Sequence, residues 1–362
     1  MTSFAKPHSL MPDESWQPVS YDQLSGWTHD DHSLAFEVFK AGAGKIAGQD
    51  TQHSLHRIGK IAQSHDQPGV EQARGFFEEH FTPHQFVDCR NSPGFVTGYF
   101  EPEVKAFLHP SEDYCVPLYR RPDDLVSISD ANRPEGMSAD RVFGRTSGGR
   151  IEPYFDRLEI QSGALGGKGL ELVWLKDKTD AFFIHVQGSA RLVLPDGDVM
   201  RIAYAAKNGH PYTSIGRILA DQLNLPPNKM TADMLARWMR DHPQDIDGLM
   251  AQNRSYIFFQ IVEGLDLGAG PIGAAGLPLA AGRSLAIDCQ HHAYGLPVWV
   301  NAPDAEIDEH GTVRRLMIAQ DTGSAIKGPQ RGDLFVGSGD RAGYLAGKVR
   351  SSATFHILVP TS

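Results

Sequence analysis

The protein has 362 residues, of which 41% are hydrophobic and 22% charged, proportions that are ordinary for a soluble globular protein and exclude a disordered or collagen-like chain. Its formal net charge of −10 argues against nucleic acid as a partner, because phosphate binding needs a basic surface. The 37 glycines and 23 prolines predict many turns and a β-rich architecture. No apolar run of 18 residues occurs and the N-terminus has no apolar signal region, so we expect a soluble chain.

The N-terminal part of the chain is predicted to be mainly helical. Apolar residues recur at helical spacing within 34–39, 55–62 and 73–81, and each stretch predicts a helix. The pattern then changes to that of a strand over residues 94–102, which ends at a proline.

Short strands and capped helices are predicted for the middle of the chain. We expect strands at 170–175, at 181–188 and at 191–194, the last running into the turn Pro195-Asp196-Gly197. Ser214 and Thr231 are each expected to cap a helix.

The C-terminal third is predicted to consist of strands. A strand is expected at 255–259, and the glycine-rich stretch 264–271 predicts a linker or hinge. Further strands are predicted at 284–287, 297–301, 315–319, 334–336 and 354–359.

The three cysteines, Cys89, Cys115 and Cys289, lie far apart and form no CxxC pair, which excludes a zinc knuckle. One disulfide or three buried free thiols both remain open. A GxGxxG match at 268–273 lacks the preceding strand that a nucleotide site needs, and 42–46 lacks the first glycine and the hydroxyl residue of a phosphate loop. With both nucleotide motifs incomplete, we expect no nucleotide. HExxH, a metal-binding motif, does not occur either, so we expect no metal, and GxSxG is also missing from the sequence.

Three aspartates stand at the ends of predicted C-terminal strands. Asp288 follows the predicted strand at 284–287, Asp321 closes the strand predicted at 315–319, and Asp333 opens the strand predicted at 334–336. Glycosidic cleavage needs a protonated carboxyl beside the scissile oxygen, and apolar surroundings or neighbouring carboxylates raise the pKa of an aspartate. The alternative is that each aspartate binds backbone N–H groups in a turn.

Seven segments together resemble the membrane-bound lytic murein transglycosylase A (MltA) family, whose C-terminus is a three-aspartate (3D) domain. They keep the family's order along the chain, and they are residues 97–102, 185–190, 204–216, 253–259, 284–288, 321–328 and 331–337. The resemblance implies an α+β fold with a discontinuous double-psi β-barrel domain made of residues 1–102 and 269–362. A second, small β-barrel domain is inserted at 103–268, and the glycan lies in a groove between the two.

The resemblance also implies an activity. The family cleaves the β-1,4 bond between N-acetylmuramic acid (MurNAc) and N-acetylglucosamine (GlcNAc) without water and leaves a 1,6-anhydro end. The family's catalytic aspartate maps to Asp333, which would act first as acid and then as base, while Asp288 and Asp321 would support it. No metal or cofactor is implied. The expected partners are peptidoglycan glycan strands and the cell-wall synthesis machinery, and the expected state is a monomer in the periplasm or cell envelope, in association with the outer membrane.

A set of polar residues is expected to bind substrate, and the alternative is a structural role. These residues are Thr97, Tyr99, Glu101, Gln187, Ser189, Lys207, Asn208 and Lys327. Thr97 and Tyr99 map to groove positions of the family, whereas Glu101 departs from the family pattern and its role stays open. Two rival functions also remain open. One is a glycoside hydrolase that uses two carboxylates, for example Asp333 and Glu101, and the other is a wall-binding module without activity.

Overall fold

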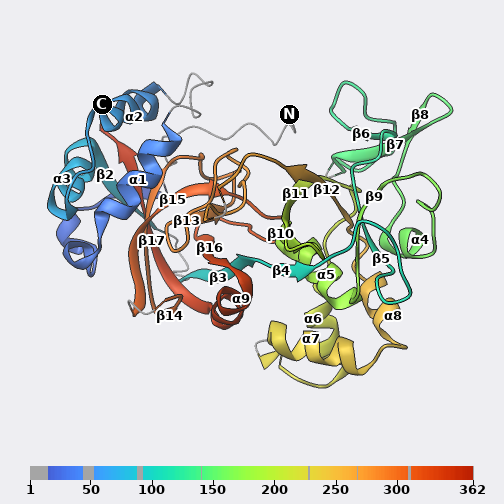
Figure 1. Ribbon diagram of the computed structural model, residues 1–362. Coiled ribbons are helices and arrows are strands. Elements are labelled where there is room, and N and C mark those ends of the chain that lie inside the picture. The colour runs from blue at the N-terminus through green and yellow to red at the C-terminus, as the bar shows by residue number, and fades with distance from the viewer. Residues whose placement is uncertain are drawn as a thin grey trace. The chain divides into compact units, whose positions relative to one another are not determined.

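The computed structural model describes residues 15–43, 53–87, 93–139, 141–226, 229–266, 268–308 and 311–361. The chain forms two compact units (Figure 1). Unit 1 consists of Met1–Phe100 and Asp266–Ser362, and unit 2 consists of Glu101–Leu265. Within the described residues, no helix combines the length and the apolar character needed to cross a lipid bilayer.

The three helices predicted for the N-terminal part are confirmed in unit 1. They are α1 (His32–Gly42), α2 (His53–Ser64) and α3 (Val70–His80). Two short 3-10 turns, η1 (Tyr21–Gln23) and η2 (Trp27–His29), precede them. The third prediction ran one residue too far, because Phe81 has an extended backbone and opens a strand.

The described part of unit 1 contains one sheet of eight strands in the order β1-β2-β17-β14-β15-β13-β16-β3. Strand β3 also pairs with β17, so the six strands from β17 to β3 close into a barrel. The α+β fold with a closed barrel is therefore confirmed. The strands are β1 (Trp16–Pro18), β2 (Phe81–Phe86), β3 (Gly94–Glu101), β13 (Ser284–Ile287), β14 (Pro297–Glu306), β15 (Thr312–Asp321), β16 (Arg331–Ser338) and β17 (Arg350–Pro360).

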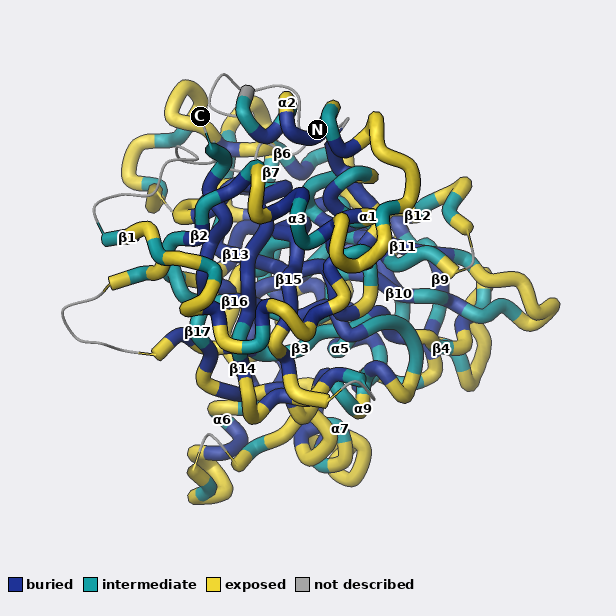
Figure 2. Tube along the Cα trace, turned by 90° about the vertical axis from the view of Figure 1, so that its left-hand side faces the viewer, coloured by how far each residue is buried: buried dark blue, intermediate teal, exposed yellow. Residues whose placement is uncertain are grey.

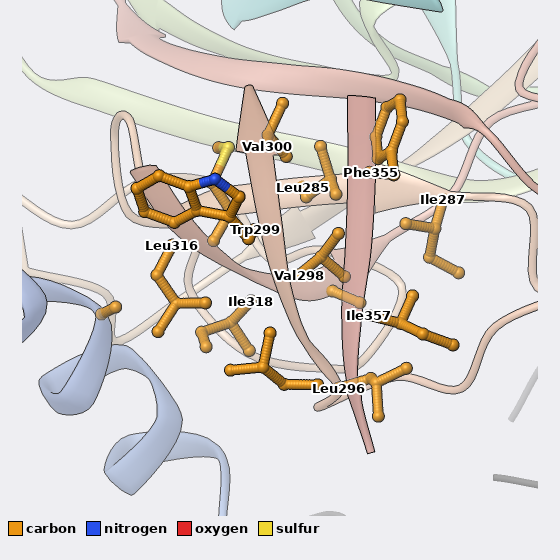
Figure 3. Close-up of a cluster of buried hydrophobic side chains, with 14 of the residues drawn as sticks. Leu285, Ile287, Leu296, Val298, Trp299, Val300, Leu316, Ile318, Phe355 and Ile357 are labelled. Atoms are coloured by element: carbon orange, nitrogen blue, oxygen red, sulfur yellow. The ribbon is translucent and has the colours of Figure 1, made fainter. Parts of the chain in front are cut away.

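The barrel encloses a core of aliphatic side chains, among them Leu285, Val298 and Ile357 (Figure 3). Strand β14 is buried on both faces, because Trp299 points away from Val298 and packs against Trp27 with ring centroids 5.2 Å apart. Strands β13, β15 and β16 are coloured as buried along much of their length in Figure 2. The continuous apolar runs of the C-terminal third thus become strands covered on two sides.

One helix of unit 1, α9 (Gly339–Lys348), was not predicted. It follows β16 directly and contributes Ala342 and Ala346 to the core. Three of its ten residues are glycine and its buried side chains are only methyl groups, so neither helix propensity nor an apolar stripe indicates it in the sequence.

Unit 2 contains a circuit of strands that also closes on itself. Four strands pair in the order β12-β11-β10-β4, and β5 pairs with β9. Single bridges complete the circuit, from Arg120 beside β5 to Phe259 in β12, and from Trp174 in β9 to Phe107 after β4. The strands are β4 (Glu103–Lys105), β5 (Val116–Tyr119), β9 (Glu171–Leu175), β10 (Ser189–Val193), β11 (Val199–Lys207) and β12 (Ile257–Val262).

The predicted strand at 181–188 is wrong, because these residues lie in helix α5 (Lys178–Gln187). Asp177 caps its first turn by accepting a hydrogen bond from the Thr179 N–H at 2.7 Å, and Gly188 ends it with a φ of 81°. The helix is buried on several sides against two cores of unit 2. Without an exposed polar face it has no helical periodicity, and a short apolar run ended by glycine looks like a strand.

The two predicted helix caps are confirmed. Ser214 accepts from the Arg217 N–H and starts α6 (Ile215–Gln222), and Thr231 accepts from the Met234 N–H and starts α7 (Ala232–Asp241). Both helices pack with α8 (Ile246–Ala251) around a small apolar core. The other elements of unit 2 are α4 (Arg157–Gln161), β6 (Leu125–Ser127), β7 (Phe143–Ser147) and β8 (Arg150–Glu152).

Candidate active site

The first part of the site lies on β16, where alternate residues point to opposite faces of the barrel wall. Gly332 and Leu334 face the core, so Arg331 and Asp333 share the opposite face. A Cβ atom at Gly332 would lie 2.9 Å from Leu285 Cδ1 and 2.9 Å from Phe355 Cε1, which explains why only glycine fits between Arg331 and Asp333. Sterics inside the barrel thus fix which side the acid faces.

Strand β3, which is next to β16, presents two further groups on that face. Val96 is fully buried in the core, so its alternating neighbours Phe95, Thr97 and Tyr99 point to the other side. Strand pairing therefore brings Thr97 close to an aspartate 236 positions further along the chain.

The register of β13 aligns two of the three aspartates. Ala286 pairs with Asp321 of the parallel strand β15 on one side and with Asp333 of the antiparallel strand β16 on the other. The register shifts between Leu285 and Ala286, so Gln320 is skipped as a partner. Such a bulge turns the following side chain to the other face, and here it points Asp321 to the face that carries Asp333.

Asp333 is held by a chain of two hydrogen bonds. The Thr97 hydroxyl donates to its Oδ1 at 2.6 Å, and the Arg331 Nη2 donates to Thr97 Oγ1 at 2.6 Å. Burial raises the pKa of Asp333 to about 6, an effect that Thr97 and Arg331 oppose and that the nearby Asp321 charge increases. A substantial fraction of this carboxyl is therefore protonated at mildly acidic pH.

Asp321 has partners of its own. Its Oδ2 accepts from the Tyr99 hydroxyl at 2.9 Å, and its Oδ1 accepts from the Ala274 N–H at 2.9 Å. Burial raises the pKa of Asp321, and it raises the pKa of Tyr99 well above its ordinary value, so the tyrosine stays a donor. The Tyr99 ring also lies 5.4 Å from that of Phe335, which fixes its direction.

Asp288 lies in the turn after β13 and is almost fully buried. Its carboxylate accepts from the Gln290 N–H at 3.1 Å and from the Gly328 N–H at 2.8 Å, and the Lys327 Nζ lies 3.7 Å from it. Asp288 thus ties its own turn to the loop that leads into β16. This geometry suits the supporting role expected for it, that of holding loops.

Comparison with known proteins places the chain in a family. The MltA specific insert domain family matches residues 95–260, and the 3D domain family matches residues 283–359. A crystal structure of a membrane-bound lytic murein transglycosylase from Agrobacterium tumefaciens is 42% identical, with a TM-score of 0.87 over 96% of this chain and 98% of that one. The chain belongs to the MltA family.

Two further relatives agree with this membership. The structure of MltA from Neisseria gonorrhoeae in its monoclinic form is 33% identical, with a TM-score of 0.79 over 98% of this chain and 97% of that one. Membrane-bound lytic murein transglycosylase A of Vibrio cholerae is 31% identical over 259 residues, which are 69% of this chain. The chain spans 61% of the length of that curated relative.

Two residues of this MltA family member that were predicted to bind substrate are instead enclosed by protein. Glu101 is 1% exposed, and its Oε2 accepts from Arg191 at 3.1 Å and from Arg201 at 2.8 Å. Asn208 is fully buried and bonds to four backbone groups, namely the carbonyls of 155 and 254 and the N–H groups of 210 and 256. In this structure both side chains hold parts of unit 2 together.

The other predicted contacts differ in exposure. Ser189 is buried at the start of β10, whereas Gln187 and Lys207 are partly exposed in unit 2 and Lys327 is exposed in unit 1. Thr97 and Tyr99 lie beside the aspartates, as described above.

Sequence reasoning missed Arg331 and Ala274 as parts of the site. Arg331 stands two residues before Asp333, and this spacing on a strand could have placed both on one face. Ala274 contributes only its backbone N–H, which no sequence pattern indicates.

The expectation of three buried thiols is wrong for Cys115, which is exposed as a free cysteine. Cys289 is also free and half-buried, and Cys89 lies outside the described residues. Within the part of the chain that the structure describes, Cys115 and Cys289 therefore form no disulfide with each other.

Proposed function

We propose that this protein is a lytic transglycosylase that cleaves the β-1,4 bond between MurNAc and GlcNAc in peptidoglycan and leaves a 1,6-anhydro-MurNAc end. The observation that carries the proposal is Asp333, a carboxyl with a pKa raised to about 6 and held by Thr97. Membership of the MltA family and the names of its relatives as lytic murein transglycosylases support the same reaction.

In the first half of the reaction, Asp333 acts as a general acid. Its proton passes to the glycosidic oxygen while the bond from that oxygen to C1 of MurNAc breaks, and the GlcNAc part leaves as an alcohol. A raised pKa keeps the acid form populated, and general acid help of this kind is worth about 10²–10⁴-fold in rate.

In the second half, the Asp333 carboxylate acts as a base. It takes the proton of the MurNAc C6 hydroxyl while that oxygen forms its bond to C1, which closes the anhydro ring and restores the protonated acid. The nucleophile belongs to the sugar itself, so the step gains from proximity and needs no second carboxylate. The enclosure of Glu101 by Arg191 and Arg201 removes the second carboxylate considered for a hydrolase.

We further propose that unit 1 is the catalytic domain and that unit 2 is the inserted domain, as expected for residues 1–102 with 269–362 and for 103–268. Thr97 and Tyr99 are proposed to contact the sugar beside the aspartates. Gln187, Lys207 and Lys327 have partly or fully exposed polar groups that suit hydrogen bonds to hydroxyl or N-acetyl groups. Action on peptidoglycan implies a location in the cell envelope.

Digestion of purified peptidoglycan tests the proposal. Wild-type protein and Asp333→Asn are incubated with sacculi, and the muropeptides are read by mass spectrometry. We expect products that are one water lighter than hydrolytic ones from the wild type, and a loss of at least about 10²-fold in the variant. Hydrated products would identify a hydrolase, binding without turnover would identify a wall-binding module, and full activity of the variant would reject Asp333.

A further inference from the structure

We propose that Arg331 is a positioning residue that acts through Thr97 to place the acidic proton of Asp333 on Oδ2. This inference deepens the proposed function and rests on it. Three groups in a row carry it: the Arg331 guanidinium, the Thr97 hydroxyl and the Asp333 carboxyl, joined by two hydrogen bonds of 2.6 Å each.

The direction of these hydrogen bonds follows from the chemistry of the first group. A guanidinium can only donate, so Thr97 Oγ1 must accept from Arg331. The single Thr97 hydrogen then has one polar neighbour left among the described residues, which is Asp333 Oδ1. If Asp333 donated to Thr97 instead, that hydrogen would have no acceptor there. Oδ1 is therefore an acceptor, and a protonated Asp333 carries its hydrogen on Oδ2.

Arg331 is itself fixed, as a positioning residue must be. Its Nη1 donates to the carbonyl oxygen of Gly332, and its guanidinium carbon lies 5.5 Å from the centroid of the Phe95 ring. With Nη2 on Thr97, three contacts hold the planar group in one orientation. The hydroxyl that it orients therefore has little freedom to turn.

Two opposite charges act on Asp333 from the strands around it. Arg331 lies on the same strand and lowers its pKa, whereas Asp321 at the end of β15 raises it. Strand β3 contributes the uncharged hydroxyls of Thr97 and Tyr99, and β13 contributes Ala286, which has no charge. Arg331 thus has two separable effects, because its charge shifts the pH profile and its hydrogen bond sets the maximal rate.

Steady-state kinetics of anhydro-muropeptide release across pH separate these effects. Arg331→Met removes both the hydrogen-bond donor and the positive charge. We expect kcat on the acidic plateau of the pH–rate profile to fall about tenfold, because the donor is lost. We also expect the alkaline limb of that profile, where activity falls as pH rises, to move to higher pH, because the charge that lowers the pKa of Asp333 is lost. Arg331→Lys keeps the charge but not the planar fork, so its limb should stay near that of the wild type. Arg314→Met, which removes an exposed arginine of β15, is the matched control and should change neither quantity.

A double-mutant cycle tests whether Arg331 acts through Thr97. Thr97→Val should lower the plateau about as much as Arg331→Met, and the double variant should lose little more than either single one. Thr97→Ser keeps the hydroxyl and should retain most of the rate. This variant also keeps the inference testable if Thr97→Val does not fold.

Three results would overturn the inference: an unchanged plateau in Arg331→Met, a fall in plateau without a shift of the limb, or a double variant whose loss is the product of both single losses. Each of these outcomes still leaves anhydro products from the wild type. Failure of the proposed function is a different result, because then the wild type itself releases no anhydro product.

Discussion

Replacing Asp321 by asparagine should move the pH profile of the enzyme to lower pH. The change keeps the size of the side chain but removes a negative charge that raises the pKa of Asp333. The carbonyl oxygen of the new amide can accept from the Ala274 N–H in place of Oδ1. The amide nitrogen can donate to the Tyr99 hydroxyl, which turns from donor to acceptor. The site should therefore survive the change, and the lost charge should dominate its effect.

The size of the shift follows from the register of the sheet. Asp321 and Asp333 flank Ala286 on two neighbouring strands, so their backbones lie two strand spacings apart, about 10 Å. With an effective dielectric constant of about 20 for sites within a protein, two unit charges at about 10 Å interact by about 1.7 kcal/mol. One pKa unit corresponds to about 1.4 kcal/mol, so the pKa of Asp333 should fall by about 1.2.

The sign of the change in activity is fixed by the role of Asp333 as an acid. Activity is present while Asp333 is protonated and is lost as pH rises through its pKa, so a lower pKa moves the alkaline limb of kcat/KM to lower pH. The measurement is the release of anhydro-muropeptides between about pH 4 and pH 8. Asp66→Asn removes the same charge from an exposed position and should leave the limb in place. A limb that does not move, or that moves to higher pH, would refute the electrostatic role of Asp321.

Two buried ion pairs allow predictions about stability rather than catalysis. Asp30→Asn removes the carboxylate charge and one of the two oxygens that accept from Arg283 at 2.8 Å, so the arginine is left buried inside unit 1 without its counter-charge. The change should cost about 3–5 kcal/mol of unfolding free energy in a denaturant titration, and a loss under about 1 kcal/mol would contradict the prediction. Glu101→Gln leaves Arg201 buried beside a neutral group, so it should likewise destabilise unit 2. The KM for peptidoglycan should stay unchanged. A raised KM at normal stability would instead identify Glu101 as a sugar contact.

The elements that the sequence predicts correctly are those with a local chemical signal. Ser214 and Thr231 offer side-chain oxygens to the first turn of a helix, and both helices begin after them. The C-terminal strands contain short continuous apolar runs, which are typical of strand segments buried on both faces. Helix α5 was mistaken for a strand because it is buried on several sides. Helix α9 was missed because only the methyl groups of two alanines are buried and its three glycines lower its helix propensity.

The candidate site was only partly visible in the sequence for a similar reason. Aspartates at strand ends can be found from local patterns, and resemblance to a family singled out Asp333. That Asp321 and Asp333 share a face depends on the bulge at Gln320 and on the register of β13, which arise from pairing across the barrel. The bond between Arg331 and Thr97 joins residues 234 positions apart, so no window of sequence contains it.

The surroundings of Asp333 can be understood from the two tasks proposed for it. A residue that first gives a proton and later takes one back works best with a pKa near the working pH, because a much higher value weakens the acid and a much lower value weakens the base. Burial and Asp321 alone would raise the pKa further than Thr97 and Arg331 allow, and the balance of the four lies at about 6. Removing either charge should therefore harm one half of the reaction while favouring the other. Arg331 and Asp321 thus shift the pKa of Asp333 in opposite directions, and together they hold it near the working pH. Each single variant should move the alkaline limb of the pH–rate profile. The double variant that lacks both charges should return that limb toward its original pH.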